Sequence, residues 1–310
     1  MPLSSKITVV EVGPRDGFQM EREFMPTATK IEIVNQLIQT GLRSFEVTSF
    51  VSPKAIPQMR DAAEVVAGVN RVPGLCLAAL VPNPTGAEHA AQAGIDEMVV
   101  FVSATESHNK SNVNRNIAES LKGFESVAQI AAKAGIPLRG AVAVAFGCPF
   151  EGNVSPEQVG DIVEHMWTLG ITAVTLGDTT GMATPPTVRE TTRYLKDRFP
   201  EIGLALHFHN TRGIGLVNVY EALQLGYQRF ESSIGGLGGC PFAPGATGNV
   251  ATEDLVYLIR ELDLDCGVDL PKLIECARLV EQVIGRTLPG QVMKAGLRLR
   301  RYPPQNQTAG

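Results

Sequence analysis

Eight short apolar runs, rich in β-branched residues, recur along the chain about once every 30 to 40 residues, as strands do in βα repeats. Helix-like stretches separate them. The runs cover residues 7–12, 44–49, 76–81, 97–103, 138–146, 173–178, 203–209 and 229–235. About eight βα units without a change of composition predict an α/β fold, a closed (β/α)8 TIM barrel. An open parallel sheet with an extra strand would leave a similar pattern and is the alternative.

Glycines that end five of the helix-like stretches support the βα interpretation. They are Gly41, Gly94, Gly135, Gly170 and Gly226. Glycine is the usual left-handed residue after a helix, because it lacks the Cβ atom that penalises this conformation. Each glycine therefore predicts a turn from a helix into the next strand.

The length of 310 residues and the hydrophobic content of 44% fit one barrel domain. After the eighth strand the pattern predicts one or two further helices, one of them over residues 270–283. We therefore expect residues 1–295 to form a single catalytic barrel that includes extra C-terminal helices. Residues 296–310 are rich in arginine and contain prolines, and we expect a flexible tail there, with a packing arm as the alternative.

Charge and targeting signals limit which partners and which cellular compartment we expect. The net charge of −5 argues against nucleic acid or an anionic membrane as a partner. No apolar run is long enough to span a bilayer, and the first strand-like run leaves no room for a signal or transit peptide, so we expect a cytoplasmic protein. Five cysteines without a Cys-x-x-Cys arrangement predict free thiols, at Cys76, Cys148, Cys240, Cys266 and Cys276.

Two histidines, His207 and His209, stand at the end of the seventh predicted strand. Residues two apart on a strand project to the same side, so both imidazoles could reach one metal ion. Two strand histidines that bond to the backbone are the alternative. In a TIM barrel the carboxyl ends of the strands carry the active site, which favours the metal site.

Other polar residues also stand at the ends of predicted strands. Arg15 and Asp16 follow the first strand, Glu46 lies in the second, Glu106 follows the fourth and Asp178 ends the sixth. Asp178 alone could equally be a turn or cap residue. In a closed barrel all of these residues would surround one mouth.

Several motifs, in this order along the chain, resemble the 3-hydroxy-3-methylglutaryl-CoA lyase family. This family belongs to a larger group of metal-dependent barrel enzymes that make or break carbon–carbon bonds next to an acyl-CoA. The resemblance runs from about Val10 to Arg278. The most specific motifs are residues 11–17 (EVGPRDG), 48–54 (TSFVSPK), 147–152 (GCPFEG), 235–241 (GGLGGCP) and 248–254 (GNVATED).

The resemblance implies a divalent metal, Mg2+ or Mn2+, held by four ligands. These are Asp16, His207, His209 and Asn249. It also implies catalytic roles for Arg15, Glu46 and Cys240, to which we add His207 and Asp178. Arg15 would stabilise an enolate oxygen, and Cys240, on a glycine-rich loop, would protonate the acetyl-CoA carbanion. Both histidines and Asp16 are candidates for the base.

The resemblance further implies the reaction. We expect cleavage of 3-hydroxy-3-methylglutaryl-CoA, or a related tertiary 3-hydroxyacyl-CoA, to acetyl-CoA and a keto acid, acetoacetate for the parent substrate. Such a lyase would act in leucine degradation, and we expect a homo-oligomer, a dimer. The alternatives are a lyase for a citramalyl-type CoA, a condensing enzyme of the isopropylmalate or homocitrate synthase type, and a barrel without catalysis.

The sequence departs from the family after the second histidine. Where the lyases usually continue with Asp-Thr-Tyr-Gly-Gln, this chain reads NTRGI at residues 210–214. The guanidinium of Arg212 could pair with a carboxylate of the substrate and favour a citramalyl-type CoA, or could point to solvent. We expect further substrate contacts from Asn83, Glu106, Asn112 and Asn114, with turn closure as the alternative for the three asparagines.

Overall fold

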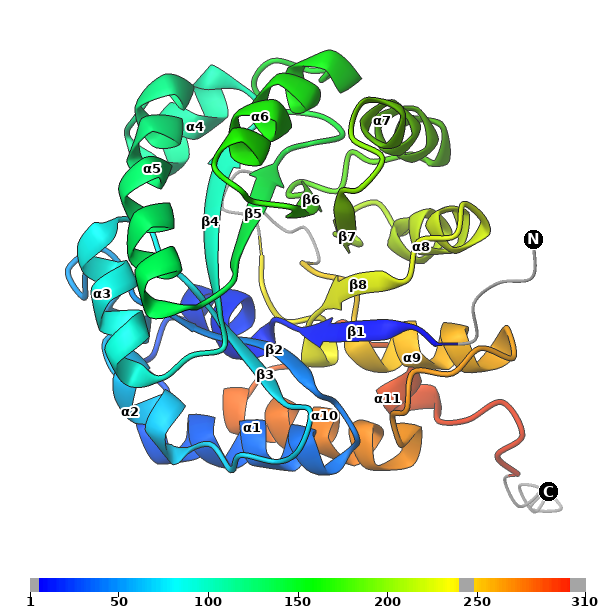
Figure 1. Cartoon of the computed structure of the whole chain (residues 1–310). Helices are drawn as coiled ribbons and strands as arrows, with labels where there is room; N and C mark the ends of the chain where they lie inside the picture. The colour runs from blue at the N-terminus through cyan, green and yellow to red at the C-terminus, as the bar shows by residue number, and fades with distance from the viewer. Residues whose placement is uncertain (1–5, 240–247, 302–310) are drawn as a thin grey trace, which may run out of the picture.

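Eight parallel strands close into a barrel in the computed structural model of the chain, which describes residues 6–239 and 248–301 (Figure 1). Each strand pairs with the next along the chain, and β8 pairs with β1 through Thr8 and Arg229. The strands are β1 (Thr8–Glu11), β2 (Ser44–Ser49), β3 (Cys76–Leu80), β4 (Glu97–Ser103), β5 (Leu138–Ala143), β6 (Ala173–Asp178), β7 (Gly203–Phe208) and β8 (Arg229–Ser232). The closure confirms the predicted TIM barrel and excludes the open sheet.

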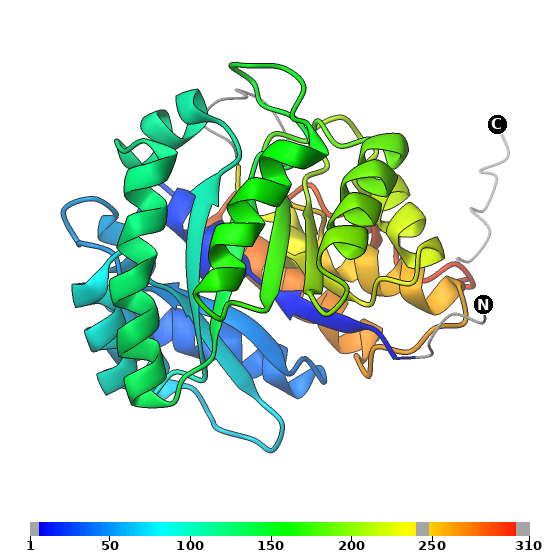
Figure 2. The same cartoon turned by 45° about the horizontal axis from the view of Figure 1, so that its top comes forward.

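Helices follow every strand and surround the barrel on the outside (Figure 1). In Figure 2 the green helices α5 and α6 run alongside the strands that they cover. The α-helices are α1 (Thr27–Gln39), α2 (Ala62–Gly68), α3 (Pro84–Ala93), α4 (Glu106–Val113), α5 (Ile117–Ala134), α6 (Pro156–Thr168), α7 (Pro185–Arg198), α8 (Gly215–Gln224), α9 (Thr252–Glu261), α10 (Leu270–Ile284) and α11 (Val292–Ala295). The predicted helix over residues 270–283 is therefore confirmed as α10.

Local sequence explains where these elements begin and end. The five glycines expected to end helices all have a positive φ. Two predicted strands were too long by three residues. Val144, with φ 52°, leaves the extended conformation and ends β5, and after β8 the chain turns into a short 3-10 helix, η4 (Ile234–Gly236).

The barrel interior contains both apolar and charged side chains. Ala78, Leu80 and Val99, on β3 and β4, form a small apolar cluster of their own. Charged side chains also point into the interior: Arg139 on β5 bonds to Glu231 on β8, and because these strands are not neighbours in the barrel, the contact crosses its interior.

Other predictions concern the termini, the thiols and membrane spans. The four described cysteines are free, and Cys240 lies outside the described residues. None of the helices within residues 6–239 and 248–301 combines the length and apolar character of a membrane span. Arg298 pairs with Glu261 at 2.7 Å, so the first residues after α11 contact the barrel helices. The division at residue 295 and the flexibility of the tail stay predictions.

Candidate active site

Asp16 and Arg15 lie in a five-residue π-helical turn, η1 (Gly13–Gly17), directly after β1. The backbone N–H of Asp16 donates to Val12 at 2.7 Å, which curls the chain back over the barrel mouth. The buried Glu11 carboxylate fixes this turn, because its Oε1 accepts from the N–H groups of Gly13 and Ile234, both at 2.8 Å. The motif of residues 11–17 thus joins the ends of β1 and β8 and presents two charged side chains between them.

The two histidines face one another at the end of β7. Their Nε2 atoms are 3.2 Å apart, and both side chains are largely buried. The Nδ1 atom of His207 lies 2.9 Å from Glu231 Oε2, so the carboxylate holds a proton on Nδ1 and leaves Nε2 toward His209. Burial and the nearby His207 lower the pKa of His209 to about 3, which keeps this imidazole in the neutral form that binds metals.

Asn249 reaches the histidines because residues 248–252 thread between the ends of β7 and β8. Val250 donates to Phe208 at 3.1 Å, and Ser233 donates to Val250 at 3.1 Å. This places Asn249 in a bridge with His209. Its Nδ2 donates to Asp16 Oδ2 at 2.7 Å, so the amide and the carboxylate lie side by side.

The donor set fits a divalent metal ion. One ligand atom each from Asp16, His207 and His209 lies within 4.8 Å of the others. The Oδ1 atom of Asn249 is buried and has no hydrogen-bond partner within the described part of the chain. Adjacent ligands of an octahedral ion bound at 2.0–2.1 Å lie about 3 Å apart, close to the separation of the two imidazole nitrogens. Nitrogen, carboxylate and amide ligands without thiolates suit Mg2+ or Mn2+ better than a structural zinc.

Arg15 is held on two sides beside this donor set. Its Nε donates to Glu46 Oε1, and its Nη1 donates to Asp16 Oδ1 at 2.7 Å. Burial raises the pKa of Asp16, but Arg15 and the histidines outweigh this effect, and the net pKa is lowered. Asp16 is therefore ionised, as a metal ligand must be.

The predicted residues share a cavity of about 810 Å³ at the barrel mouth. Its lining includes Arg15, Asp16, Glu46, His207, His209, Asn83, Asn112 and Asn114. The asparagines also have structural roles: Asn83 Oδ1 caps α3 at Gly86 N, and Asn114 ends α4 with φ 54°. Contact with a ligand and turn closure are therefore compatible for these residues.

Asn249 does not itself line this cavity, and neither do three further predicted residues. Glu106 accepts from the N–H of Ile117 at 3.0 Å. Asp178 Oδ1 accepts from Met182 and Ala183 at 2.7 and 2.9 Å, and its burial raises its pKa to about 7. The carboxyl group therefore closes the loop after β6, and the catalytic role of Asp178 stays a prediction.

The third is Arg212, which is exposed after β7. Its Nη1 donates to the carbonyl oxygens of Thr180 and Gly181, both at 2.8 Å. The guanidinium thus ties the loop after β7 to the loop after β6. Cys240 lies outside the described residues.

The sequence interpretation missed three polar residues inside the barrel: Arg139, Thr175 and Glu231. Each stands inside a predicted strand, and together they form hydrogen bonds of 2.5 to 2.8 Å. Charged residues within otherwise apolar strands were the available signal. His108 also lines the cavity.

Comparisons with known proteins identify the family of the chain. A model described as HMGL-like matches residues 6–280. Hydroxymethylglutaryl-CoA lyase YngG of Bacillus subtilis (strain 168) is 46% identical over 291 residues, 94% of this chain and 97% of that protein. The mitochondrial hydroxymethylglutaryl-CoA lyase of Gallus gallus is 43% identical over 95% of this chain and 99% of its own length.

Solved structures show the same relationship. An HMG-CoA lyase from Acinetobacter baumannii, in complex with coenzyme A and 3-methylmalate, matches with a TM-score of 0.93 and 43% identity. The match covers 98% of this chain and 99% of that one. The Bacillus subtilis HMG-CoA lyase structure has a TM-score of 0.92 and 46% identity, over 95% of this chain and 99% of that one. The chain therefore belongs to the HMGL-like family.

Proposed function

We propose that the chain is a divalent-metal-dependent lyase that cleaves 3-hydroxy-3-methylglutaryl-CoA to acetyl-CoA and acetoacetate. The observation that carries the proposal is the group of Asp16, His207, His209 and Asn249 beside Arg15, at the mouth of one cavity. The curated relatives named hydroxymethylglutaryl-CoA lyase, over nearly the full length of the chain, support the substrate.

The reaction moves one proton and one electron pair before the final protonation. The tertiary hydroxyl loses its proton, and its carbon becomes the ketone of acetoacetate. The bond from this carbon to the CH2 group next to the thioester breaks. The electron pair of that bond passes to the CH2 carbon and is delocalised onto the thioester oxygen as an enolate. Protonation of this carbon then gives acetyl-CoA.

Asp16, His207, His209 and Asn249 would hold a divalent ion, which would supply Lewis-acid polarisation of the substrate hydroxyl. Asp16 and the two histidines are the candidates for the base that removes the hydroxyl proton. We assign stabilisation of the enolate oxygen to the Arg15 guanidinium, which Glu46 and Asp16 hold in place. We assign protonation of the carbon to Cys240, which follows β8 in the sequence.

Product analysis tests this proposal. Protein loaded with Mg2+ or Mn2+ is incubated with 3-hydroxy-3-methylglutaryl-CoA and with citramalyl-CoA, and the keto acids are identified. Acetoacetate and acetyl-CoA in equal amounts are expected from the first thioester. If neither thioester is cleaved, the proposal fails. Incubation of acetyl-CoA with 2-keto acids tests the condensing alternative in the same assay.

The citramalyl-type alternative has an observation in its favour. The 3-methylmalate in the Acinetobacter baumannii structure carries its hydroxyl next to a carboxylate, as a citramalyl group does. Pyruvate as the main product would identify this second substrate.

We further propose that the enzyme is a cytoplasmic homodimer and acts in leucine degradation. Some relatives are named cytoplasmic and others mitochondrial.

A further inference from the structure

We infer that Arg139 is a positioning residue that, from the floor of the active site, orients both Arg15 and His207 through two bridging carboxylates. The inference rests on the proposed function, since it assigns a residue to the same site. Arg139 lies on β5, and only 2% of its side chain is exposed.

All three nitrogens of the guanidinium face carboxylates, but only Nη1 and Nε donate hydrogen bonds, whereas Nη2 has an ion-pair contact and no hydrogen-bond partner within the described residues. Its Nη1 donates to Glu231 Oε1 and to Thr175 Oγ1, both at 2.5 Å. Its Nε donates to Glu97 Oε2 at 3.0 Å, and its Nη2 lies 3.6 Å from Glu46 Oε2. The rigid fork of a guanidinium can serve several carboxylates at once, which a lysine cannot.

The two carboxylates nearest the active site each divide their oxygens between Arg139 and a functional residue. Glu46 presents Oε2 to Arg139 and Oε1 to Arg15. Glu231 presents Oε1 to Arg139 and Oε2 to Nδ1 of His207. Arg139 is therefore one contact away from the proposed enolate-stabilising group and one contact away from a proposed metal ligand.

Both bridging carboxylates are buried, so each needs a positively charged partner nearby. The side chains of Glu46 and Glu231 are 2% and 4% exposed. In the absence of Arg139, the cation between these two buried carboxylates is lost, and they would repel each other. We expect them to move apart and to carry the side chains of Arg15 and His207 out of position.

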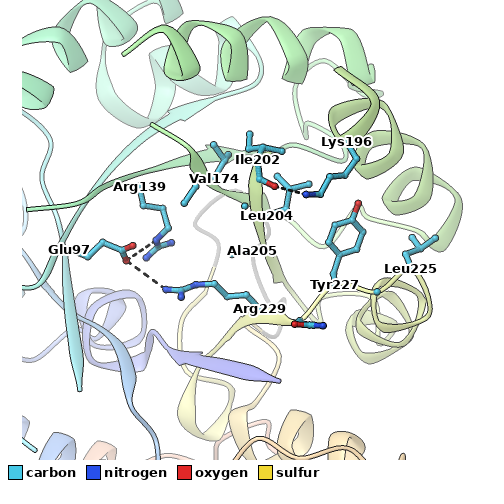
Figure 3. A pocket seen from close by; sticks show the side chains of 14 residues that line it. Glu97, Arg139, Val174, Lys196, Ile202, Leu204, Ala205, Leu225, Tyr227 and Arg229 are labelled. Carbon is cyan, nitrogen blue, oxygen red and sulfur yellow. Dashed lines mark hydrogen bonds and ion pairs between the residues drawn. The ribbon is translucent and has the colours of Figure 1, made fainter. Parts of the chain in front are cut away.

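Arg139 also separates the active-site cavity from a second cavity. Figure 3 shows this second cavity, of about 560 Å³, with Arg139 and Arg229 pointing toward Glu97 from two sides. Its lining includes Arg229, which is a third exposed, and the first residues of β4, β6, β7 and β8. The active-site cavity reaches Glu46, Thr175 and Glu231 from the other end. A small cation could therefore reach the position of the guanidinium from the base of the barrel.

The test compares Arg139→Met, Arg139→Lys and a control variant in the full chain. Lys30→Met is the matched control, because the Lys30–Asp61 ion pair is equally buried, at 3% and 7% exposure, and lies outside the charged network. For each variant we would measure the melting temperature, the Kd of Mn2+ by calorimetry, and kcat and KM at saturating metal.

Arg139→Met and Lys30→Met should both have a lower melting temperature than the wild type. Of these two, only Arg139→Met should lose function in the folded state. We expect its Kd for Mn2+ to rise roughly 10–100-fold, as for other groups that orient metal ligands. Its kcat should fall at least about tenfold with KM changed by less than about threefold, because the loss concerns the transition state. Arg139→Lys should fall between Arg139→Met and the wild type.

Chemical rescue gives a second readout. Guanidinium ions at millimolar concentration should restore part of the Mn2+ affinity and kcat of Arg139→Ala, and should leave Lys30→Met unchanged. The inference is overturned if folded Arg139→Met and Arg139→Lys bind Mn2+ and turn over as the wild type does. If the wild type binds Mn2+ but cleaves no thioester, the proposed function fails, while the Mn2+ affinities of the variants still decide the role of Arg139.

Discussion

The Nε2 atoms of His207 and His209 lie 3.2 Å apart, with Glu231 behind the first imidazole. Two nitrogens at this distance either share one proton or bind one cation. Burial alone would lower the pKa of His207, but Glu231 at Nδ1 outweighs this effect and raises it, whereas burial lowers the pKa of His209 to about 3. A cation that displaces the proton between the two Nε2 atoms would receive one lone pair from each imidazole. Asp16 supplies the negative charge that a divalent cation requires.

The first prediction concerns the metal. We expect His209→Ala to raise the Kd of Mn2+ more than about 100-fold, because loss of a ligand exceeds the loss of a group that orients one. Folding should be retained, since the residue lies at the mouth of the barrel. Calorimetry gives the Kd, and His89→Ala, on the exposed face of α3, is the control. Full activity of the wild type in excess chelator would contradict the metal assignment.

The second prediction concerns Arg15. Arg15→Gln removes the positive charge and keeps a shorter, polar side chain. We expect kcat to fall about 10²–10³-fold, or about 2.7–4 kcal/mol, the range for loss of one oxyanion donor. KM should change little, because the interaction forms mainly in the transition state. Steady-state kinetics at saturating metal measure both values, and an equal loss in KM with unchanged kcat would assign Arg15 to substrate binding alone.

The third prediction concerns Gly238, at the start of the loop after η4. Its φ is 100°, and a Cβ atom there would lie 2.5 Å from Asn249 Nδ2 and 3.3 Å from Asp16 Oδ2. We therefore expect Gly238→Ala to displace Asn249 and to weaken Mn2+ binding at least about tenfold.

Gly74→Ala is the matched control for this prediction. Gly74 also has a positive φ, 76°, but a Cβ atom there would meet nothing within 4 Å. Both variants should lose roughly 1–2 kcal/mol of stability to backbone strain, and only Gly238→Ala should lose metal affinity. Equal Mn2+ affinities in the two variants would separate Gly238 from the metal site.

The repeat pattern in the sequence predicted most of the fold. Residues 44–49, 97–103 and 173–178 were predicted with the bounds that β2, β4 and β6 have, and a glycine stands three residues before the start of each. The pattern failed at Val144, since a β-branched residue with a positive φ gives no warning in the sequence. Barrel closure was predicted from the number of units, and the β1–β8 pairing supplied the proof.

The candidate site could be predicted only where neighbours along the chain determine it. His207 and His209 share a strand, so their period of two was sufficient. Asn249 depends on a segment that threads between β7 and β8, and only the family resemblance pointed to it. The contact of Arg139 with Glu231 crosses the barrel, and no spacing in the sequence encodes a contact between strands that are not neighbours.

The fourth prediction concerns the pH dependence of stability. Glu253 is fully buried, and burial, followed by the nearby Asp254, raises its pKa to about 8. The folded state therefore keeps a proton that the unfolded chain, with a pKa of about 4.3, releases. Between about pH 5 and 8 the unfolded state binds fewer protons, so the free energy of unfolding falls as the pH rises.

Glu253→Gln should flatten this pH dependence. A glutamine keeps the acceptor for the N–H of Gly235, at 3.0 Å in the wild type, and cannot ionise. We expect the difference between the urea midpoints at pH 5.5 and pH 8 to shrink, though not to vanish, because burial also raises the pKa of Glu11 to about 7. Glu275→Gln, on the exposed face of α10, is the control. An unchanged difference in Glu253→Gln would show that this carboxyl group is ionised in the folded state.

The last prediction concerns Arg212, the cation that stands where the family usually has tyrosine. A carboxylate clamp would need its guanidinium in the cavity, whereas Nη1 bonds to the carbonyl oxygens of Thr180 and Gly181. We therefore expect Arg212→Tyr to change the ratio of kcat/KM for 3-hydroxy-3-methylglutaryl-CoA and citramalyl-CoA by less than about tenfold, or 1.4 kcal/mol. The melting temperature should fall, because two loops lose their link. A larger change of the ratio toward 3-hydroxy-3-methylglutaryl-CoA would assign Arg212 to recognition of the substrate carboxylate, since only a group that contacts the acid can distinguish the two thioesters to that extent.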